Sequence, residues 1–142
     1  MSTVSFHLDS RLTAPELMRV LTDFGPARAD AWPTIDAAHF QVHTRGADWA
    51  EVTEGTASAW ERSRYEWDEA AGRVEITTHE SKVFGVGGGW VFQLTPQAEG
   101  TRVDVRLDRP GEKLAQKLAA RLLPFVAPAS LAKSFRAPLQ AK

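Results

Sequence analysis

The feature that most constrains the fold is a change of hydrophobic period near Gly111. Before it, apolar and polar residues alternate in short runs, which is typical of strands with one buried face. After it, apolar residues recur at helical spacing: Leu114, Leu118, Leu122 and Phe125. They lie along one side of a helix, and this apolar stripe must be buried. Only the preceding strands offer a large enough partner, so we expect a long C-terminal helix to lie across a curved antiparallel sheet.

The N-terminal part predicts one strand and two short helices. Residues 4–8 alternate between apolar and polar, which indicates a half-buried strand. The run Thr13-Ala-Pro-Glu16 is typical of a helix start, with proline at the first helical position and an acid in the first turn. A helix is therefore expected over 13–24, where Gly25-Pro26 ends it, and a second short one over 27–32.

From residue 39 onward the alternation predicts strands joined by tight turns. The expected strands are 39–43, 49–54, 59–68, 73–83, 90–95 and 102–108. Neighbouring strands at this spacing form an antiparallel meander. Matching the apolar faces places Leu94 opposite Val103, and Trp67 opposite Val74. One face of the sheet is then charged and the other apolar, and the apolar face must be covered.

Composition excludes several classes of function. The chain has 142 residues, a net charge of −1 and no cysteine, so it has no disulfide, no thiol nucleophile and no nucleic-acid footprint. Its longest apolar run, 122–129, is far shorter than the roughly 20 residues of a membrane span. The start has no charged segment followed by an apolar core, so we expect no signal peptide and a soluble, cytoplasmic protein.

Two motifs invite a cofactor or metal interpretation that their context does not favour. Gly85-Val-Gly-Gly-Gly89 has Trp90 where a dinucleotide loop needs glycine, and a strand follows it, so a hairpin turn is expected. His39 and His43 are four apart, but on a strand that spacing puts them roughly 13 Å apart, too far for one ion. We therefore expect no metal and no cofactor.

The order of elements resembles the START-like, or SRPBCC, superfamily, and within it the polyketide cyclase/dehydrase and lipid-transport group. The stretches that carry the resemblance are AEVTEGTASAWERSRYEW, RVEITTHESKVFGVGGGWVFQLTP, EGTRVDVRLDR and EKLAQKLAARLLPFVAP. The resemblance covers essentially the whole chain, 1–142, as a single domain. It implies an α+β helix-grip fold, in which six or seven antiparallel strands wrap around the C-terminal helix and two short helices follow the first strand. It also implies a deep apolar cavity between sheet and helix.

Three functional hypotheses follow. The first is binding of a small hydrophobic molecule, such as a lipid or polyketide, by cavity-lining residues: Phe24, Trp32, Phe40, Tyr65, Trp67, Ile76, Trp90 and Phe92. The second is a cyclase or dehydratase-type enzyme, which needs a buried ionisable pair. The third is an interaction module with a filled core.

The candidate catalytic residues are Glu61 and Glu80. They face each other on the inner side of the sheet if Trp67 is opposite Val74, and opposed carboxylates can perform acid/base chemistry. We favour the interpretation that they lie in water at the open end of the sheet. The sequence therefore favours a binding protein over an enzyme.

Overall fold

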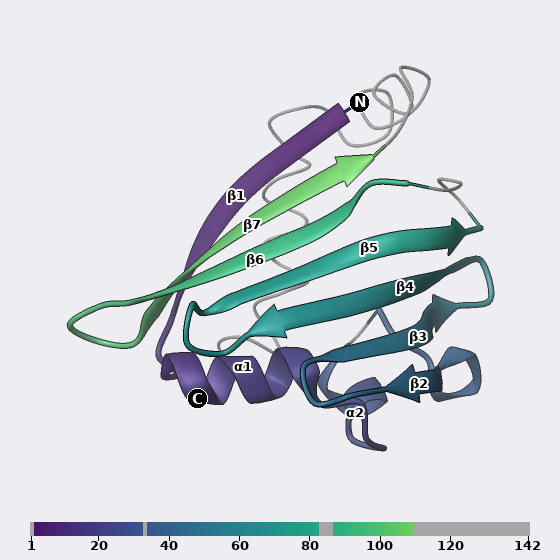
Figure 1. Ribbon diagram of the computed structural model, residues 1–142, viewed down its shortest axis with the longest axis horizontal. Coiled ribbons are helices and arrows are strands. Elements are labelled where there is room, and N and C mark those ends of the chain that lie inside the picture. Colours follow the sequence, from purple (N-terminus) through teal and green to yellow (C-terminus); the bar gives the residue numbers. More distant parts are fainter. Residues whose placement is uncertain (1, 33, 83–86, 110–142) are drawn as a thin grey trace.

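The computed structural model describes residues 2–32, 34–82 and 87–109 (Figure 1). Its strands are β1 (Ser2–Ser10), β2 (Gln41–Arg45), β3 (Trp49–Thr56), β4 (Ala59–Asp68), β5 (Arg73–Ser81), β6 (Gly89–Pro96) and β7 (Thr101–Arg109). Its helices are α1 (Ala14–Thr22), α2 (Arg28–Ala31) and the 3-10 helix η1 (Ala37–His39). The predicted C-terminal helix lies outside the described residues.

The described strands form one antiparallel sheet in the order β1-β7-β6-β5-β4-β3-β2. Strands β2 to β7 form a meander, and β1 pairs with β7 to complete the opposite edge. The segment with α1 and α2 connects the two edge strands (Figure 1). The structure therefore confirms the predicted antiparallel sheet of six or seven strands, and the two short helices after the first strand.

Helix α1 begins and ends where its local chemistry allows. The Thr13 hydroxyl accepts a hydrogen bond from the Glu16 backbone N–H and donates one to the Glu16 carboxylate. This cap gives a partner to one of the backbone N–H groups that the first turn leaves without one. The helix ends at Thr22, two residues earlier than predicted, where the Asp23 carboxylate accepts a hydrogen bond from the Gly25 N–H at 2.9 Å. Helix α1 buries one side, formed by Leu17, Met18 and Leu21.

The registers predicted for two strand pairs, β6–β7 and β4–β5, hold apart from the end of the second pair. Leu94 is opposite Val103, and Trp67 is opposite Val74. The inner face is apolar, and its side chains are buried: Ala50, Val52, Tyr65, Val74, Ile76, Phe92, Leu94, Val103, Val105 and Leu107. The outer face carries ion pairs between exposed or half-buried side chains, such as Arg73 with Glu75.

Two bulges change the predicted pairing at the end of the sheet. In β5, His79 is an extra residue, so Glu61 is opposite Ser81 and Glu80 is opposite Arg62. The prediction that Glu61 faces Glu80 is therefore wrong, because a bulge shifts every later pair by one residue. In β2, His43 is likewise extra.

The strand predicted over 39–43 also begins later than expected. His39 closes the 3-10 helix, and Asp36 caps that helix by accepting a hydrogen bond from the Ala38 N–H at 3.0 Å. The strand starts only at Gln41. An aspartate cap, which provides local hydrogen bonds, therefore prevails over the strand pattern here.

Gly100 provides a test of how closely the β6–β7 turn approaches β1. It has a φ of 90°, and a Cβ added there would lie 1.9 Å from the Ser10 carbonyl oxygen. We expect Gly100→Ala to lower the free energy of unfolding by at least roughly 1–3 kcal/mol, measured by urea denaturation.

Gly25→Ala is the matched control for this prediction. Gly25 is outside the positive-φ glycines, and the nearest atom to an added Cβ is a side-chain oxygen of Asp23 at 3.1 Å. It should change the free energy of unfolding by less than about 0.5 kcal/mol. Equal effects of the two substitutions would contradict the proposed close approach at Gly100.

Candidate functional site

The eight residues predicted to line a cavity all belong to one hydrophobic cluster. Five are buried and three are partly buried against them: Phe24, Trp32, Tyr65, Ile76 and Phe92, and then Phe40, Trp67 and Trp90. The Phe24 ring meets Tyr65 edge-on, with centroids 4.9 Å apart, and Trp90 stacks on Phe92 at 6.2 Å. The structure thus brings together residues from the helical segment and from strands β4, β5 and β6. Their contact with a ligand stays a prediction.

The sequence analysis missed a buried charge in this cluster. Arg28, on α2, is only 3% exposed. Its Nε donates a hydrogen bond to Glu54 Oε2 at 2.8 Å, and its Nη2 donates one to the Tyr65 hydroxyl at 2.9 Å. Its Nη1 donates to the carbonyl oxygens of Leu21 and Asp23 at 3.2 and 3.0 Å. Every nitrogen of the guanidinium therefore has a partner within the protein.

Tyr65 and Glu54 complete this group, which we call the Arg28 cluster. The Tyr65 hydroxyl donates a hydrogen bond to Glu54 Oε1 while it accepts one from Arg28. The guanidinium also lies over the Phe24 ring, 4.6 Å from its centroid, which adds a cation–π contact. The buried charge is thus paired and hydrogen-bonded, the condition under which proteins tolerate one.

The ionisation states of the Arg28 cluster follow from burial and charge. Burial opposes the charge on Arg28, but the oxygens of Tyr65 and Glu54 outweigh it, so the pKa of Arg28 lies above its ordinary value. Burial raises the pKa of Tyr65 well above its ordinary value, and the negative charge of Glu54 raises it further, against the opposing effect of Arg28. At neutral pH Arg28 is charged and Tyr65 is a neutral hydrogen-bond donor.

The inward position of Glu54 could have been predicted from the sequence. Glu54 shares the strand parity of Ala50 and Val52, so the alternation already placed it on the buried face. An inward carboxylate requires a cation or donors. Nothing in the four-residue helix α2 identifies Arg28 as that cation, because its partners are 26 and 37 residues away.

The structure separates the two predicted catalytic glutamates. Glu61 is half-buried on the inner face, where it is opposite Glu54 rather than Glu80. Glu80 is exposed. The carboxylate that shares the inner face with Glu61 is therefore one that the sequence analysis did not consider.

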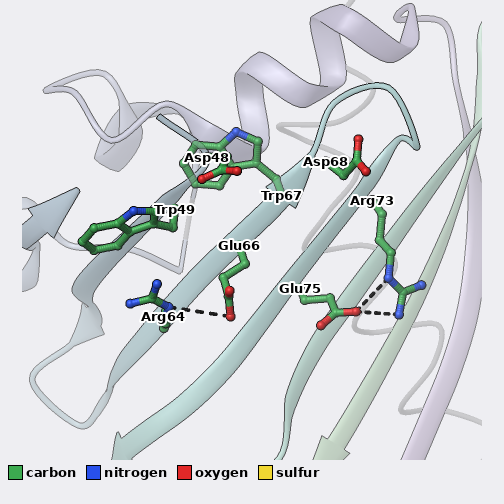
Figure 2. A pocket seen from close by; sticks show the side chains of 8 residues that line it. All are labelled: Asp48, Trp49, Arg64, Glu66, Trp67, Asp68, Arg73 and Glu75. Carbon is green, nitrogen blue, oxygen red and sulfur yellow. Dashed lines mark hydrogen bonds and ion pairs between the residues drawn. The ribbon is translucent and has the colours of Figure 1, made fainter. Parts of the chain in front are cut away.

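A polar groove of about 380 Å³ lies at one end of the outer face (Figure 2). Its lining residues are Asp48, Trp49, Arg64, Glu66, Trp67, Asp68, Arg73 and Glu75. The Arg64 guanidinium lies 4.4 Å from the Trp49 ring centroid and pairs with Glu66 at 3.6 Å. Its charged lining distinguishes this groove from the predicted apolar cavity.

Two of the described histidines, His39 and His43, have a side-chain partner. His43 Nε2 is 2.7 Å from Thr53 Oγ1, and His39 Nδ1 is 3.4 Å from Asp36. Within the described ranges, no three or more histidine or acidic side chains are grouped so that they could hold a metal ion. A search of the same residues finds no helix with the length and apolar character needed to cross a membrane.

Comparison with known proteins places this geometry in a known fold. No protein-family model and no curated protein matches the chain. A START superfamily protein from Mycobacterium smegmatis matches with a TM-score of 0.71 at 17% identity, over 96% of each chain. A protein from Thermus thermophilus matches with a TM-score of 0.72 at 17% identity, over 99% of each chain. The Zhui aromatase/cyclase from Streptomyces sp. R1128 matches with a TM-score of 0.68 at 15% identity, over 97% of this chain and 88% of that one. The predicted START-like, or SRPBCC, fold is confirmed.

Two arginine–glutamate pairs with the same N–O distance test the importance of burial. Arg28–Glu54 and Arg73–Glu75 are both 2.8 Å apart, but the arginine side chains are 2% and 45% exposed. Removing one partner of a buried pair typically costs about 3–5 kcal/mol, so we expect Arg28→Met to lower the free energy of unfolding by that order. Arg73→Met should cost less than about 1 kcal/mol. Similar losses in urea denaturation would refute a structural role for the Arg28 cluster.

Tyr65 is the only tyrosine of the chain, so tyrosinate absorbance reports this residue alone. The unfolded chain should ionise near about pH 10, whereas the folded protein should do so at clearly higher pH, because its pKa is raised. The unfolded state then loses the proton first, so stability falls as the pH rises above about 10. In Tyr65→Phe this component of the decline should disappear. Coincident titrations of the folded and urea-unfolded protein would contradict the burial argument.

Proposed function

We propose that this chain, which has a START-like fold, binds a small hydrophobic molecule on the inner face of its sheet. The observation that carries the proposal is the aromatic cluster of that face, which gathers side chains from the helical segment and the strands. Ligand sites are mostly apolar with few polar groups, and the inner face has that composition. A lipid or a polyketide is the class of ligand proposed.

The names of two similar structures support the proposal only indirectly. One is a START superfamily protein and another is an aromatase/cyclase. Both share the fold at 15–17% identity, and fold alone does not determine function. The proposal therefore depends on the residues of the inner face.

A cyclase or dehydratase-type enzyme is the alternative, and the Arg28 cluster bears on it. Such an enzyme needs a buried ionisable pair, and Glu54 with Tyr65 is one. However, a raised pKa makes the Tyr65 phenol a poor proton donor at neutral pH. Arg28 is also fully engaged by the protein. We therefore propose binding without turnover.

Tryptophan fluorescence can test where a ligand binds. Trp32 and Trp90 belong to the inner cluster and not to the lining of the outer groove, whereas Trp49 lies in that groove beneath Arg64. We expect an apolar ligand to change the emission spectrum and to raise the melting temperature. Trp49→Phe should keep that spectral change, whereas Trp32→Phe and Trp90→Phe should each reduce it.

The ligand panel for this test combines fatty alcohols, fatty esters, fatty acids and aromatic polyketides, together with mass spectrometry of molecules that copurify with the native protein. Absence of any change in emission or melting temperature across the panel would refute the proposal. A spectral change that Trp49→Phe alone abolishes would place the ligand on the outer face instead.

A further inference from the structure

The Arg28 cluster is a polar group on a mostly apolar face that also carries Glu61, Ser63 and Thr78. Its internal hydrogen bonds restrict what the cluster can recognise. Arg28 itself cannot bind a ligand anion, because its Nε, Nη1 and Nη2 all donate to protein oxygens and its side chain is 2% exposed. A carboxylate headgroup would have to displace Glu54 or two backbone carbonyl oxygens. It would also lie beside the Glu54 charge, which repels it.

Glu54 is the member of the cluster that reaches accessible space. Its side chain is 16% exposed, against 2% for Arg28 and 4% for the whole of Tyr65. It shares the inner face with Val52 and is opposite Glu61 in the register of β3 and β4. Helix α2, which carries Arg28, lies beside the β2–β3 edge of the sheet (Figure 1).

The carboxylate of Glu54 retains acceptor capacity after its internal bonds are counted. Oε2 accepts one hydrogen bond, from Arg28 Nε. Oε1 accepts one from the Tyr65 hydroxyl and a long one, at 3.5 Å, from Arg28 Nη2. A carboxylate oxygen can accept more than one hydrogen bond, so Oε2 can accept another from a molecule on the inner face.

We propose that the polar group of the ligand is a hydrogen-bond donor, such as a hydroxyl, and that Glu54 accepts its hydrogen bond. Ligands with a carboxylate headgroup are then disfavoured. This rests on the proposed function, since it specifies the chemistry of a ligand bound to the inner face. The donor adds a charge-assisted hydrogen bond at Oε2, while Arg28 and Tyr65 hold the carboxylate in place. Nothing in this arrangement offers a donor to an ester or carboxylate, because Tyr65 donates to Glu54.

Three probes with similar alkyl chains separate the effect of a hydrogen-bond donor on affinity from the effect of a negative charge. The alcohol 1-decanol has a donor, methyl decanoate has only acceptors, and decanoate adds a negative charge. We expect 1-decanol to bind roughly tenfold tighter than either of the others, as measured by calorimetric titration, because a hydrogen bond to a charged group contributes about that much.

Three variants test whether Glu54 causes this preference. Glu54→Gln should reduce it strongly, because the amide oxygen that accepts from Arg28 Nε stays in the place of Oε2 but has lost the charge that strengthens the hydrogen bond from the ligand. Tyr65→Phe removes a neighbouring hydroxyl but leaves the carboxylate, so its ratio of 1-decanol to methyl decanoate affinity should be kept or increased. Glu80→Gln removes the same charge from an exposed position of β5 and should keep the wild-type ratio.

The outcomes distinguish this inference from the proposed function. If none of the three probes binds, this inference fails, and the proposed function is decided by the wider ligand panel. If all three bind with equal affinity, the proposed function stands and this inference is wrong. A preference that is undiminished in folded Glu54→Gln would also overturn it. Should that variant not fold, loss of the preference in folded Tyr65→Phe would be the contradicting result.

Discussion

The structure depends on burial of one face of a long antiparallel sheet. Val52, Val74 and Val103 on that face are fully buried, while the opposite face carries ion pairs such as Arg102 with Asp104. At about 25 cal/mol per Å² of apolar surface, burial of the side chains on such a face contributes more to stability than any single polar interaction does. The face must therefore be covered, and α1 does this in part with Leu17 and Leu21.

Arg28 is a charged residue in this mostly apolar interface, and the position of the helical segment depends on it. Its hydrogen bonds to the carbonyl oxygens of Leu21 and Asp23 satisfy the end of α1, and its bonds to Glu54 and Tyr65 reach β3 and β4. One side chain thus joins α1, α2 and the sheet. A buried ion pair is weak evidence for net stability, but each charge must keep its partner, because a buried charge without one is strongly destabilising. We infer that the cluster mainly fixes how the helical segment meets the sheet.

We propose that the same cluster limits what the apolar face can recognise. A face lined only by rings would accept any apolar molecule of suitable shape. Glu54 adds a hydrogen-bond acceptor whose own orientation is fixed by Arg28 and by Tyr65, and buried polar groups discriminate more sharply than apolar contacts do. On this proposal Glu54 serves both fold and specificity, so we expect a change to Glu54 itself to affect both.

The sequence alone determined most of the strands, the meander that they form and the registers of β4–β5 and β6–β7 up to the bulge, because strand periodicity and turn residues are local. The pairing of β1 with β7 came only from the tertiary structure. The sequence also placed the strand residues of the aromatic cluster on one side, since parity along a strand fixes the face. It did not determine the bulge at His79, which moved Glu80 away from Glu61, because a single inserted residue leaves the alternation nearly unchanged. Nor did it determine the partner of Glu54. Only the tertiary structure determines that Arg28 pairs with Glu54, because it brings α2 against β3. An ion pair between residues 26 positions apart produces no periodic pattern in the sequence.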